Sequence, residues 1–440
     1  MLYYADFHLH SKYARATSIN MDLEHITQGA RAKGLNIVGT GDFSHPTWFS
    51  ELKKKLVESD AKGFYELKNA PAGARAKEKK ILFCLTNEVS TIISTRKGVK
   101  KVHHVIHAPS LEEVEQLNDV YSKLGNLAAD GRPTFGKCSP AEIVEKTREA
   151  VKNAVLIPAH AYTPWFSVFG DMSGFNSLDE AFEEQAKHIF AIETGLSSDP
   201  AMNWRISELD NIALMSNSDA HSYHPWRIGR ECNAFEFSEK ELNFESVFKA
   251  VREKDARRFK FTVEVDPNYG KYHYDGHRLC KFSCPPEETK KLKNICPVCK
   301  RKLTIGVLNR VEQLADRPEG FIPKNAIPFK TLLPLHELLA AAYASTLASK
   351  RVMEVGDRLI HEFGSEFGVL LNATREELLK YTQDKIADAI ITNREGKLKV
   401  KPGFDGEYGV LMLDGEKTVE KKENEAQRKE PKKQKTLEDY

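Results

Sequence analysis

The feature that most constrains the fold is the alternation of short apolar runs and helical patterns across residues 1–235. The apolar runs have the length of buried strands, and the segments between them space their apolar residues as helices do. The predicted strands are residues 2–9, 35–40, 81–86, 102–106, 154–157, 189–192 and 212–215, and the predicted helices are residues 22–33, 111–124, 140–151, 178–187 and 204–209. This alternation is typical of a parallel sheet covered by helices, and seven repeats favour a closed α/β barrel.

Histidines and carboxylates follow the predicted strands, whose ends meet at one rim in a β/α barrel. The pairs His8–His10 and Asp219–His221 have i, i+2 spacing, so each pair points to one face. The candidate metal ligands are His8, His10, Asp42, His45, Glu88, His103, His160, Asp219 and His221. Imidazoles mixed with carboxylates suit two or three divalent ions, such as Zn, Mn, Mg or Fe. Scattered structural histidines are the alternative interpretation.

Clustered divalent ions would give such a site a particular chemistry. They generate a hydroxide near neutral pH and stabilise both oxygens of an in-line displacement at phosphorus. The constellation therefore favours a metal-dependent phosphoesterase.

The net charge of +2 conceals an uneven distribution along the chain. Residues 1–249 carry a net charge of −4, residues 250–310 carry +8, and residues 311–440 carry −2. The central basic segment predicts a phosphate-rich partner, and a solvated basic face is the alternative.

Four of the seven cysteines lie in this basic segment, at Cys280, Cys284, Cys296 and Cys299. Their C-x3-C and C-x2-C spacing predicts one structural zinc ion in a reducing compartment, with His277 or His273 as a possible replacement ligand. Lysines, arginines and tyrosines surround the cluster, so residues 236–310 are expected to be a linker and a zinc module that contacts nucleic acid backbone.

Aromatic and basic residues cluster shortly after the metal motifs. The candidates for base stacking or DNA binding are Trp48, Trp165, Phe166, Trp204, Trp226, Arg227 and Arg230. Rings at a catalytic rim stack on extruded bases, and arginines hold phosphates. The alternative is that the rings only cover the top of the barrel.

The rest of the chain divides into a helical part and a polar tail. Residues 311–412 predict a C-terminal helical domain, with helices at 332–350, 352–363 and 376–391. Residues 413–440 hold few apolar residues and predict a disordered tail. The tail ends with the Q-x-x-L-x-x-aromatic spacing of a sliding-clamp-binding peptide, formed by Gln434, Leu437 and Tyr440.

Residues 1–235 resemble the PHP (polymerase and histidinol phosphatase) phosphoesterase domain through the H-x-H, Glu88, His160 and D-x-H motifs. The resemblance implies a distorted (β/α)7 barrel with a trinuclear metal site. It implies that His8, His10, Glu88 and Asp219 hold one ion, Glu88, His103 and His160 a second, and His221 a third with Asp42 or His45. The family's T-D-H motif is displaced here, because Phe43 follows Asp42.

The order of parts resembles the endonuclease Q family, through the segments GTGDFSHP, IPAHAYTPWFSVFG, ETGLSSDPAMNW and SNSDAHS. The resemblance implies a DNA repair endonuclease that uses a metal-bound hydroxide to cut 5′ of deaminated bases (uracil, hypoxanthine, xanthine) and abasic sites. It implies a 3′-hydroxyl product, a sliding-clamp partner, and Asp219 and Glu88 as catalytic carboxylates. The alternatives are a PHP phosphatase acting on a small phosphomonoester and a non-catalytic scaffold that binds DNA or the clamp.

No apolar run approaches the length that spans a bilayer, and the first ten residues lack a basic start and an apolar stretch. We therefore expect a cytoplasmic, nucleoid-associated protein without membrane contact.

Overall fold

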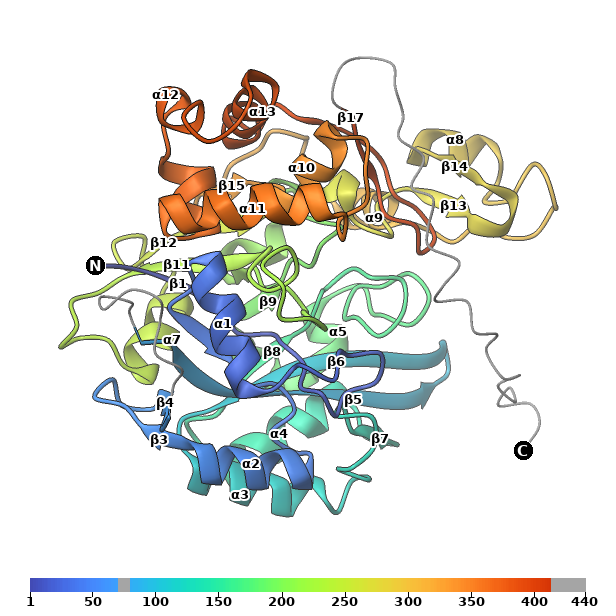
Figure 1. Ribbon diagram of the computed structural model, residues 1–440. Helices are drawn as coiled ribbons and strands as arrows, with labels where there is room; N and C mark the ends of the chain where they lie inside the picture. The colour runs from blue at the N-terminus through green and yellow to red at the C-terminus, as the bar shows by residue number, and fades with distance from the viewer. Residues whose placement is uncertain (70–79, 413–440) are drawn as a thin grey trace.

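A computed structural model describes residues 1–69 and 80–412 of the chain. The fold is mixed α/β, with strands in the middle and helices α10 to α13 stacked above them (Figure 1). A small module containing β13, β14 and α8 lies beside these upper helices, and the β5–β6 hairpin projects beneath it (Figure 1). The clamp-like peptide at Gln434, Leu437 and Tyr440 lies outside the described residues.

The largest sheet of the described chain has eleven strands. They are β1 (Leu2–Asp6), β2 (Ile37–Gly39), β3 (Leu56–Glu58), β4 (Tyr65–Leu67), β5 (Leu82–Thr95), β6 (Gly98–Ala108), β7 (Thr134–Gly136), β8 (Val155–Pro158), β11 (Cys232–Glu236), β12 (Phe259–Glu264) and β15 (Phe329–Thr331). β1, β2 and β5 are parallel neighbours, and β6 pairs with both β5 and β8. β9 (Ala191–Glu193) and β10 (Ala213–Met215) form a parallel pair beside β8. A bridge between Leu9 and Ala220 leads from the end of β10 back to β1.

The prediction that the seven strands expected in residues 1–235 form a parallel sheet is wrong at β6. Strand β6 runs antiparallel to β5 and β8, because β5 and β6 form one long hairpin that turns at Arg96 and Lys97. Gly98 has φ 112°, a left-handed conformation that glycine adopts readily at a hairpin turn. His103 therefore lies in the middle of a strand and faces Ser90 of the partner strand.

Helices cover the strands mostly where the periodicity places them. They are α1 (Leu23–Lys33), α2 (Pro46–Lys55), α3 (Leu111–Tyr121), α4 (Pro140–Ala150), α5 (Leu178–Phe182), α6 (Pro200–Asn203) and α7 (Phe244–Arg252). Asp22 accepts a hydrogen bond from the His25 backbone at the start of α1, and Gly34 ends that helix. The predicted helix at 204–209 is wrong, because α6 ends at Asn203 and a short 3-10 turn covers Ser207–Asn211.

Of the three predicted upper helices, the one at 352–363 is present as α11, the one at 332–350 is shorter, and the one at 376–391 is divided in two. The upper helices are α10 (Leu335–Ala342), α11 (Lys350–Phe363), α12 (Arg375–Leu378) and α13 (Asp384–Arg394), followed by the hairpin β16 (Lys399–Lys401) and β17 (Val410–Met412). The predicted capping box of Thr374 and Glu377 is present and begins α12, but the helix is interrupted after Leu378 and resumes as α13. Their apolar faces form a core of their own that includes Leu338, Leu359 and Ile390.

The cysteine-containing module comprises β13 (Asp275–His277), β14 (Phe282–Cys284) and α8 (Pro286–Lys291), and α9 (Val307–Leu314) follows it. Its small core contains Cys284, Cys296 and Leu303. Val307 and Val311 of α9 pack instead into the large hydrophobic core formed mainly by the strands and helices of residues 1–235. This packing anchors the module to the strands.

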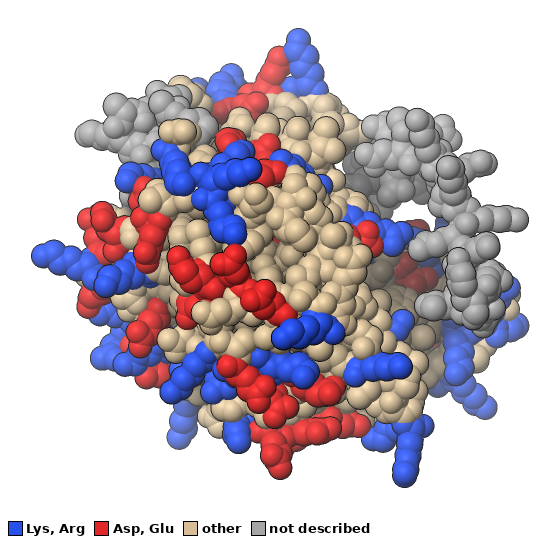
Figure 2. Space-filling model, turned by 90° about the horizontal axis from the view of Figure 1, so that it is seen from below, with Lys and Arg blue, Asp and Glu red and all other residues tan. Residues whose placement is uncertain are grey.

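On the face viewed in Figure 2, acidic and basic side chains are interspersed. Within residues 1–69 and 80–412, no helix combines the length and apolar character that a membrane crossing requires.

Candidate metal centre

Seven of the nine predicted ligands come together at one end of the strands. Their donor atoms form three overlapping groups, each lying within 4.8 Å: His8, His10 and Glu88; His10, Asp219 and His221; and Glu88, His103 and His160. Glu88 and His10 each belong to two of these groups. This sharing is the arrangement that bridged divalent ions require.

Glu88 lies at the centre of the cluster and is 2% exposed. Its Oε1 is 2.8 Å from His103 Nδ1 and 3.2 Å from His160 Nε2, and its Oε2 is 3.4 Å from His10 Nε2. Asp219 Oδ1 lies 3.1 Å from His10 Nε2 and 3.6 Å from His8 Nε2. The carboxylate oxygens and the imidazole nitrogens thus point toward one another, at separations that allow them to share a bound ion.

The donor atoms of the cluster fit a site for divalent ions. The Nε2 atoms of His8 and His10 and the Oδ1 atom of Asp219 face the cluster and are buried, and none makes a hydrogen bond among the described residues. Buried polar atoms without a hydrogen-bond partner are costly, and a bound cation would satisfy them. Nitrogen and carboxylate donors in this mixture suit Zn, Mn or Fe.

The pKa values in the cluster indicate mutual charge stabilisation. Burial alone would raise the pKa of the Glu88 carboxyl, but His103, Arg132 and His10 hold it well below its usual range. Burial likewise opposes a charged Asp219, yet His8, His10 and His221 keep the Asp219 pKa well below normal. Burial lowers the pKa of His103 to about 4, so this ring is a neutral ligand. Anionic carboxylates and a neutral imidazole are the forms that bind metal.

Three residues of the site region have backbone conformations that non-glycine residues seldom adopt. Asp42, His160 and Asp219 have φ values of 49°, 30° and 47°. Gly195 allows this at His160, because a Cβ on Gly195 would lie 2.9 Å from the His160 Cα. Strained backbone of this kind concentrates at functional sites, where packing holds a side chain in a defined direction.

Two predicted metal ligands have other roles in the structure. Asp42 lies behind the cluster, where its Oδ1 is 3.0 Å from His10 Nδ1 and its Oδ2 accepts a hydrogen bond from the Ser11 amide. His45 caps α2, accepts a hydrogen bond from the Trp48 amide, and stacks on Tyr13 at 4.5 Å. Neither joins a candidate metal group within the described chain, because Asp42 contacts the far nitrogen of His10 and His45 is turned into the helix cap.

Sequence reasoning missed two residues of the site. Glu193 Oε2 is 2.9 Å from His8 Nδ1, and its Oε1 accepts a hydrogen bond from Asn217. Arg132 Nη1 is 2.9 Å from Glu88 Oε2. Glu193 directly follows a predicted strand, so the rule that found Glu88 was sufficient to find it; Arg132 lies in a loop without any such signal.

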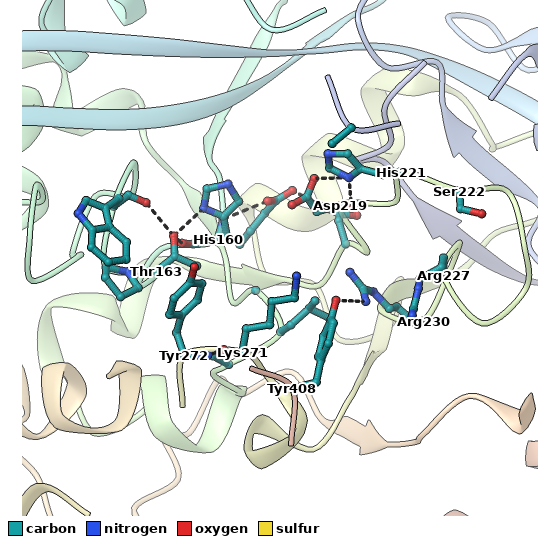
Figure 3. Close-up of a pocket in the computed structure, with 18 residues that line it drawn as sticks. His160, Thr163, Asp219, His221, Ser222, Arg227, Arg230, Lys271, Tyr272 and Tyr408 are labelled. Carbon is teal, nitrogen blue, oxygen red and sulfur yellow. Dashed lines mark hydrogen bonds and ion pairs between the residues drawn. The ribbon is translucent and has the colours of Figure 1, made fainter. Parts of the chain in front are cut away.

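A cavity of about 620 Å³ opens beside the cluster (Figure 3). His160, Asp219 and His221 belong to both the cluster and the cavity wall. The other lining residues are Ala16, Thr163, Pro164, Trp165, Glu193, Gly195, Leu196, Ser197, Asn217, Ser222, Arg227, Arg230, Lys271, Tyr272 and Tyr408. The volume lies in the range of small-molecule sites.

The predicted stacking residues separate into two groups. Trp165 is 39% exposed and lines the cavity, as do Arg227 and Arg230, and Phe166 packs over the His103 ring at 4.7 Å. Trp48, Trp204 and Trp226 do not line the cavity. Burial contradicts the stacking prediction for Trp48 and Trp226, whereas Trp204 is half-buried and its stacking role stays a prediction.

Each of these tryptophans has a structural partner. Trp48 is fully buried and donates a hydrogen bond to the Gly41 carbonyl. Trp204 meets Phe329 edge to face, and Trp226 lies between the rings of His224 and His336. Trp48 and Trp226 therefore contribute packing instead of a free ring face.

The zinc module brings together His277, Cys280, Cys296 and Cys299, whose ligand atoms lie within 4.8 Å of one another. This corrects the predicted set of four cysteines, because Cys284 Sγ is turned toward the Thr289 hydroxyl at 3.2 Å. His277 Nδ1 instead lies 3.0 Å from Cys280 Sγ and 3.3 Å from Cys299 Sγ. A Cys3His set is an ordinary structural zinc site.

The family described as the MJ0043 C-terminal domain matches residues 334–397, which include most of the upper helices. MJ0043 of Methanocaldococcus jannaschii is 35% identical over 263 residues, which are 59% of this chain and 32% of that protein. The chain thus spans about a third of the length of MJ0043. YqxK of Bacillus subtilis is 28% identical over 93% of this chain and 98% of its own length.

Two solved structures match almost the whole chain. The lesion-specific endonuclease PfuEndoQ from Pyrococcus furiosus has a TM-score of 0.81 and 33% identity, covering 97% of this chain and 98% of that one. An endonuclease Q complex with a 27-mer duplex carrying an abasic lesion at the active site has a TM-score of 0.82 and 32% identity, covering 97% and 100%. By class, the protein is an endonuclease, because the two solved structures that match almost its whole length are endonucleases. The chain belongs to the endonuclease Q family, which confirms the resemblance seen in the sequence.

Proposed function

We propose that this protein is a DNA repair endonuclease that hydrolyses the phosphodiester on the 5′ side of deaminated bases and abasic sites and leaves a 3′-hydroxyl. The observation that carries the proposal is the cavity of about 620 Å³ whose wall shares His160, Asp219 and His221 with the metal cluster. A nucleotide extruded into this cavity would bring its 5′-phosphate to the cluster. The similar endonuclease Q structure holds an abasic lesion at its active site, which supports this assignment.

The strand array is, on this proposal, a PHP-type phosphoesterase domain with two or three divalent ions. When bound, the ions supply a nucleophile at neutral pH and stabilise the oxygens of the displacement. Glu88 and Asp219 hold negative charge at the centre of the cluster, and Glu193 and Asp42 orient His8 and His10 from behind. Trp165, half-exposed at the rim, offers a ring face to the extruded nucleotide.

The zinc module is the proposed grip on the duplex. Its exposed cations lie around the Cys3His cluster: Lys281, Lys290, Lys291, Lys293, Lys300, Arg301 and Lys302. Cations in this number bind phosphates by releasing counterions, so affinity should fall steeply with salt. The sliding clamp remains a proposed partner through the C-terminal peptide.

A nicking assay on a set of labelled duplexes tests the function. Substrates carrying uracil, hypoxanthine, xanthine or an abasic site should each be cut once, 5′ of the lesion, and the undamaged duplex should stay intact. Asp219→Asn should abolish cutting and retain most DNA binding, because Asp219 lies in the cluster and not on the basic module. Hydrolysis of p-nitrophenyl phosphate or histidinol phosphate without nicking would instead indicate a small-molecule phosphatase. Binding without any turnover would indicate a scaffold.

A further inference from the structure

Three cations converge on one tyrosine in the cavity, on the side that faces the metal ligands (Figure 3). Arg230 Nη1 lies 3.4 Å from the Tyr408 hydroxyl, Lys271 Nζ lies 4.6 Å from the centre of the Tyr408 ring, and the Arg227 guanidinium lies 5.8 Å from it. The residues come from three distant segments of the chain: the loop after β10, the turn before β13, and the turn before β17. Tertiary folding alone therefore brings Arg227, Arg230, Lys271 and Tyr408 together, and they form one cationic wall of the cavity.

The positive charge of this wall is only partly balanced. Arg227 lies 3.3 Å from Glu337. Among residues 1–69 and 80–412, neither Arg230 nor Lys271 pairs with a carboxylate, since Arg230 donates to the Ser218 carbonyl and lies beside the Tyr408 hydroxyl, and Lys271 lies over the Tyr408 ring. Burial alone would raise the pKa of Tyr408, yet Arg230, Lys271 and Arg227 lower it to about 8. Like charges placed together repel unless an anion joins them.

The Arg230 side chain is buried and held in place by hydrogen bonds. It is 6% exposed, and its Nε and Nη2 both donate to the Ser218 carbonyl, at 3.2 and 3.0 Å. These bonds fix the guanidinium and leave Nη1 beside Tyr408. Because Ser218 precedes Asp219, one peptide connects this wall to the metal cluster. Tyr269 packs behind the Tyr408 ring at 5.4 Å.

We propose that Arg230, Lys271 and Tyr408 form a subsite for the phosphate on the 3′ side of the lesion nucleotide. The proposal rests on the proposed function and adds to it, since it assigns the second charged group of the extruded nucleotide. With the scissile 5′-phosphate at His160 and Asp219, the 3′-phosphate is the remaining anion of that nucleotide. It meets the cationic wall across the cavity, where guanidinium, ammonium and phenol all donate hydrogen bonds.

Methylphosphonate substitution tests the subsite, because it removes the charge of one chosen linkage. Wild-type single-turnover nicking of an abasic duplex should fall roughly tenfold to a hundredfold when the 3′ linkage of the lesion is neutral. Lys271→Met should lose about as much on the unmodified duplex and show little further loss on the modified one. Tyr408→Phe, which keeps the ring, should cause a smaller loss, and the Lys249→Met control on α7 should keep both the wild-type rate and the wild-type sensitivity.

Equal sensitivity of Lys271→Met and wild type to the neutral linkage would overturn the subsite, as would a wild-type loss only at the linkage 5′ of the scissile one. Binding of the same duplexes by chelator-treated protein, followed by fluorescence anisotropy, provides a readout independent of cleavage. If wild type does not nick the unmodified duplex, the proposed function fails. The binding data then decide the subsite by the same comparison of Lys271→Met with wild type.

Discussion

His8 and Glu193 form a buried pair in which His8 Nδ1 lies 2.9 Å from Glu193 Oε2. Because Nδ1 is engaged there, the Nε2 atom of the same ring points at Glu88 and Asp219. Asp42 holds His10 in the same way, at 3.0 Å from its Nδ1. Carboxylates placed behind metal-ligating histidines fix the orientation of the ring and increase the basicity of its free nitrogen.

Glu193→Gln should lower nicking activity and metal affinity together, by about tenfold to a hundredfold. The amide keeps the size of the side chain but removes the charge that raises the pKa of His8 well above normal against the effect of burial. Activity titrated against metal concentration, with metal content measured in parallel, checks this. Glu184→Gln, an exposed neighbour on the same stretch of chain, is the control and should behave as wild type. Unchanged metal affinity in Glu193→Gln would contradict the positioning role.

Arg132→Met should reduce single-turnover nicking by about tenfold to a thousandfold. Arg132 Nη1 contacts Glu88 Oε2 at 2.9 Å, so it places a permanent positive charge at the centre of the cluster, beside the expected position of the scissile phosphate. Arg132→Lys should recover part of the rate. The highly exposed Arg257 pairs only with Asp255 among the described residues, so Arg257→Met is the matched control. A wild-type rate in Arg132→Met would show that the contact with Glu88 has no role in the reaction.

His277→Ala and Cys296→Ala should each lose the structural zinc, whereas Cys284→Ser should retain about one equivalent. The structure gives the reason, since Cys284 Sγ faces Thr289 and His277 Nδ1 faces two cysteines of the cluster. Zinc content by elemental analysis, with DNA affinity measured alongside, distinguishes the two ligand sets. Loss of zinc in Cys284→Ser together with retention in His277→Ala would restore the four-cysteine assignment.

Glu264→Gln should make stability less dependent on pH. Glu264 is fully buried and accepts hydrogen bonds from the hydroxyls of Thr262, Thr194 and Ser216. Burial raises its pKa to about 7, so the folded state holds this proton more tightly than the unfolded state does. Its contribution to stability is therefore complete below the ordinary carboxyl pKa and is lost as pH rises toward 7.

Unfolding free energies measured from about pH 5 to about pH 8 check this expectation. The variant stays neutral throughout, so its stability relative to wild type should increase with pH. If the difference in unfolding free energy between the two proteins is constant across the range, the pKa of Glu264 is the same in the folded and unfolded states.

The site was predictable from the sequence where ligands occur in pairs at the ends of strands. His8–His10 and Asp219–His221 are such pairs, and their i, i+2 spacing predicted that the two members of each pair share a site. The structure brings both pairs together beyond the ends of β1 and β10, with Asp219 at a φ of 47°. His45 misled because the displaced histidine of the motif is needed as the N-cap of α2. The sequence alone does not distinguish a histidine that caps a helix from one that binds a metal.

The rest of the site depends on tertiary contacts that no local pattern encodes. The reversed strand β6 has the same alternation as a parallel strand, so only the hairpin with β5 reveals its direction. Tyr408 reaches Arg230 from 178 residues away in the chain. Arg132 comes from a loop whose sequence has no periodicity, and its contact with Glu88 follows from the fold alone.

Metal removal and restoration tests the central claim most directly. Protein freed of divalent ions by a chelator, with the loss verified by elemental analysis, is assayed on the abasic duplex before and after Mn, Zn or Mg is added back. We predict that nicking disappears with the metal and returns with at least one of these ions, and that Glu88→Gln does not recover. Metal-free wild-type protein that cuts the duplex at the original rate would contradict the assignment of the cluster as the catalytic centre.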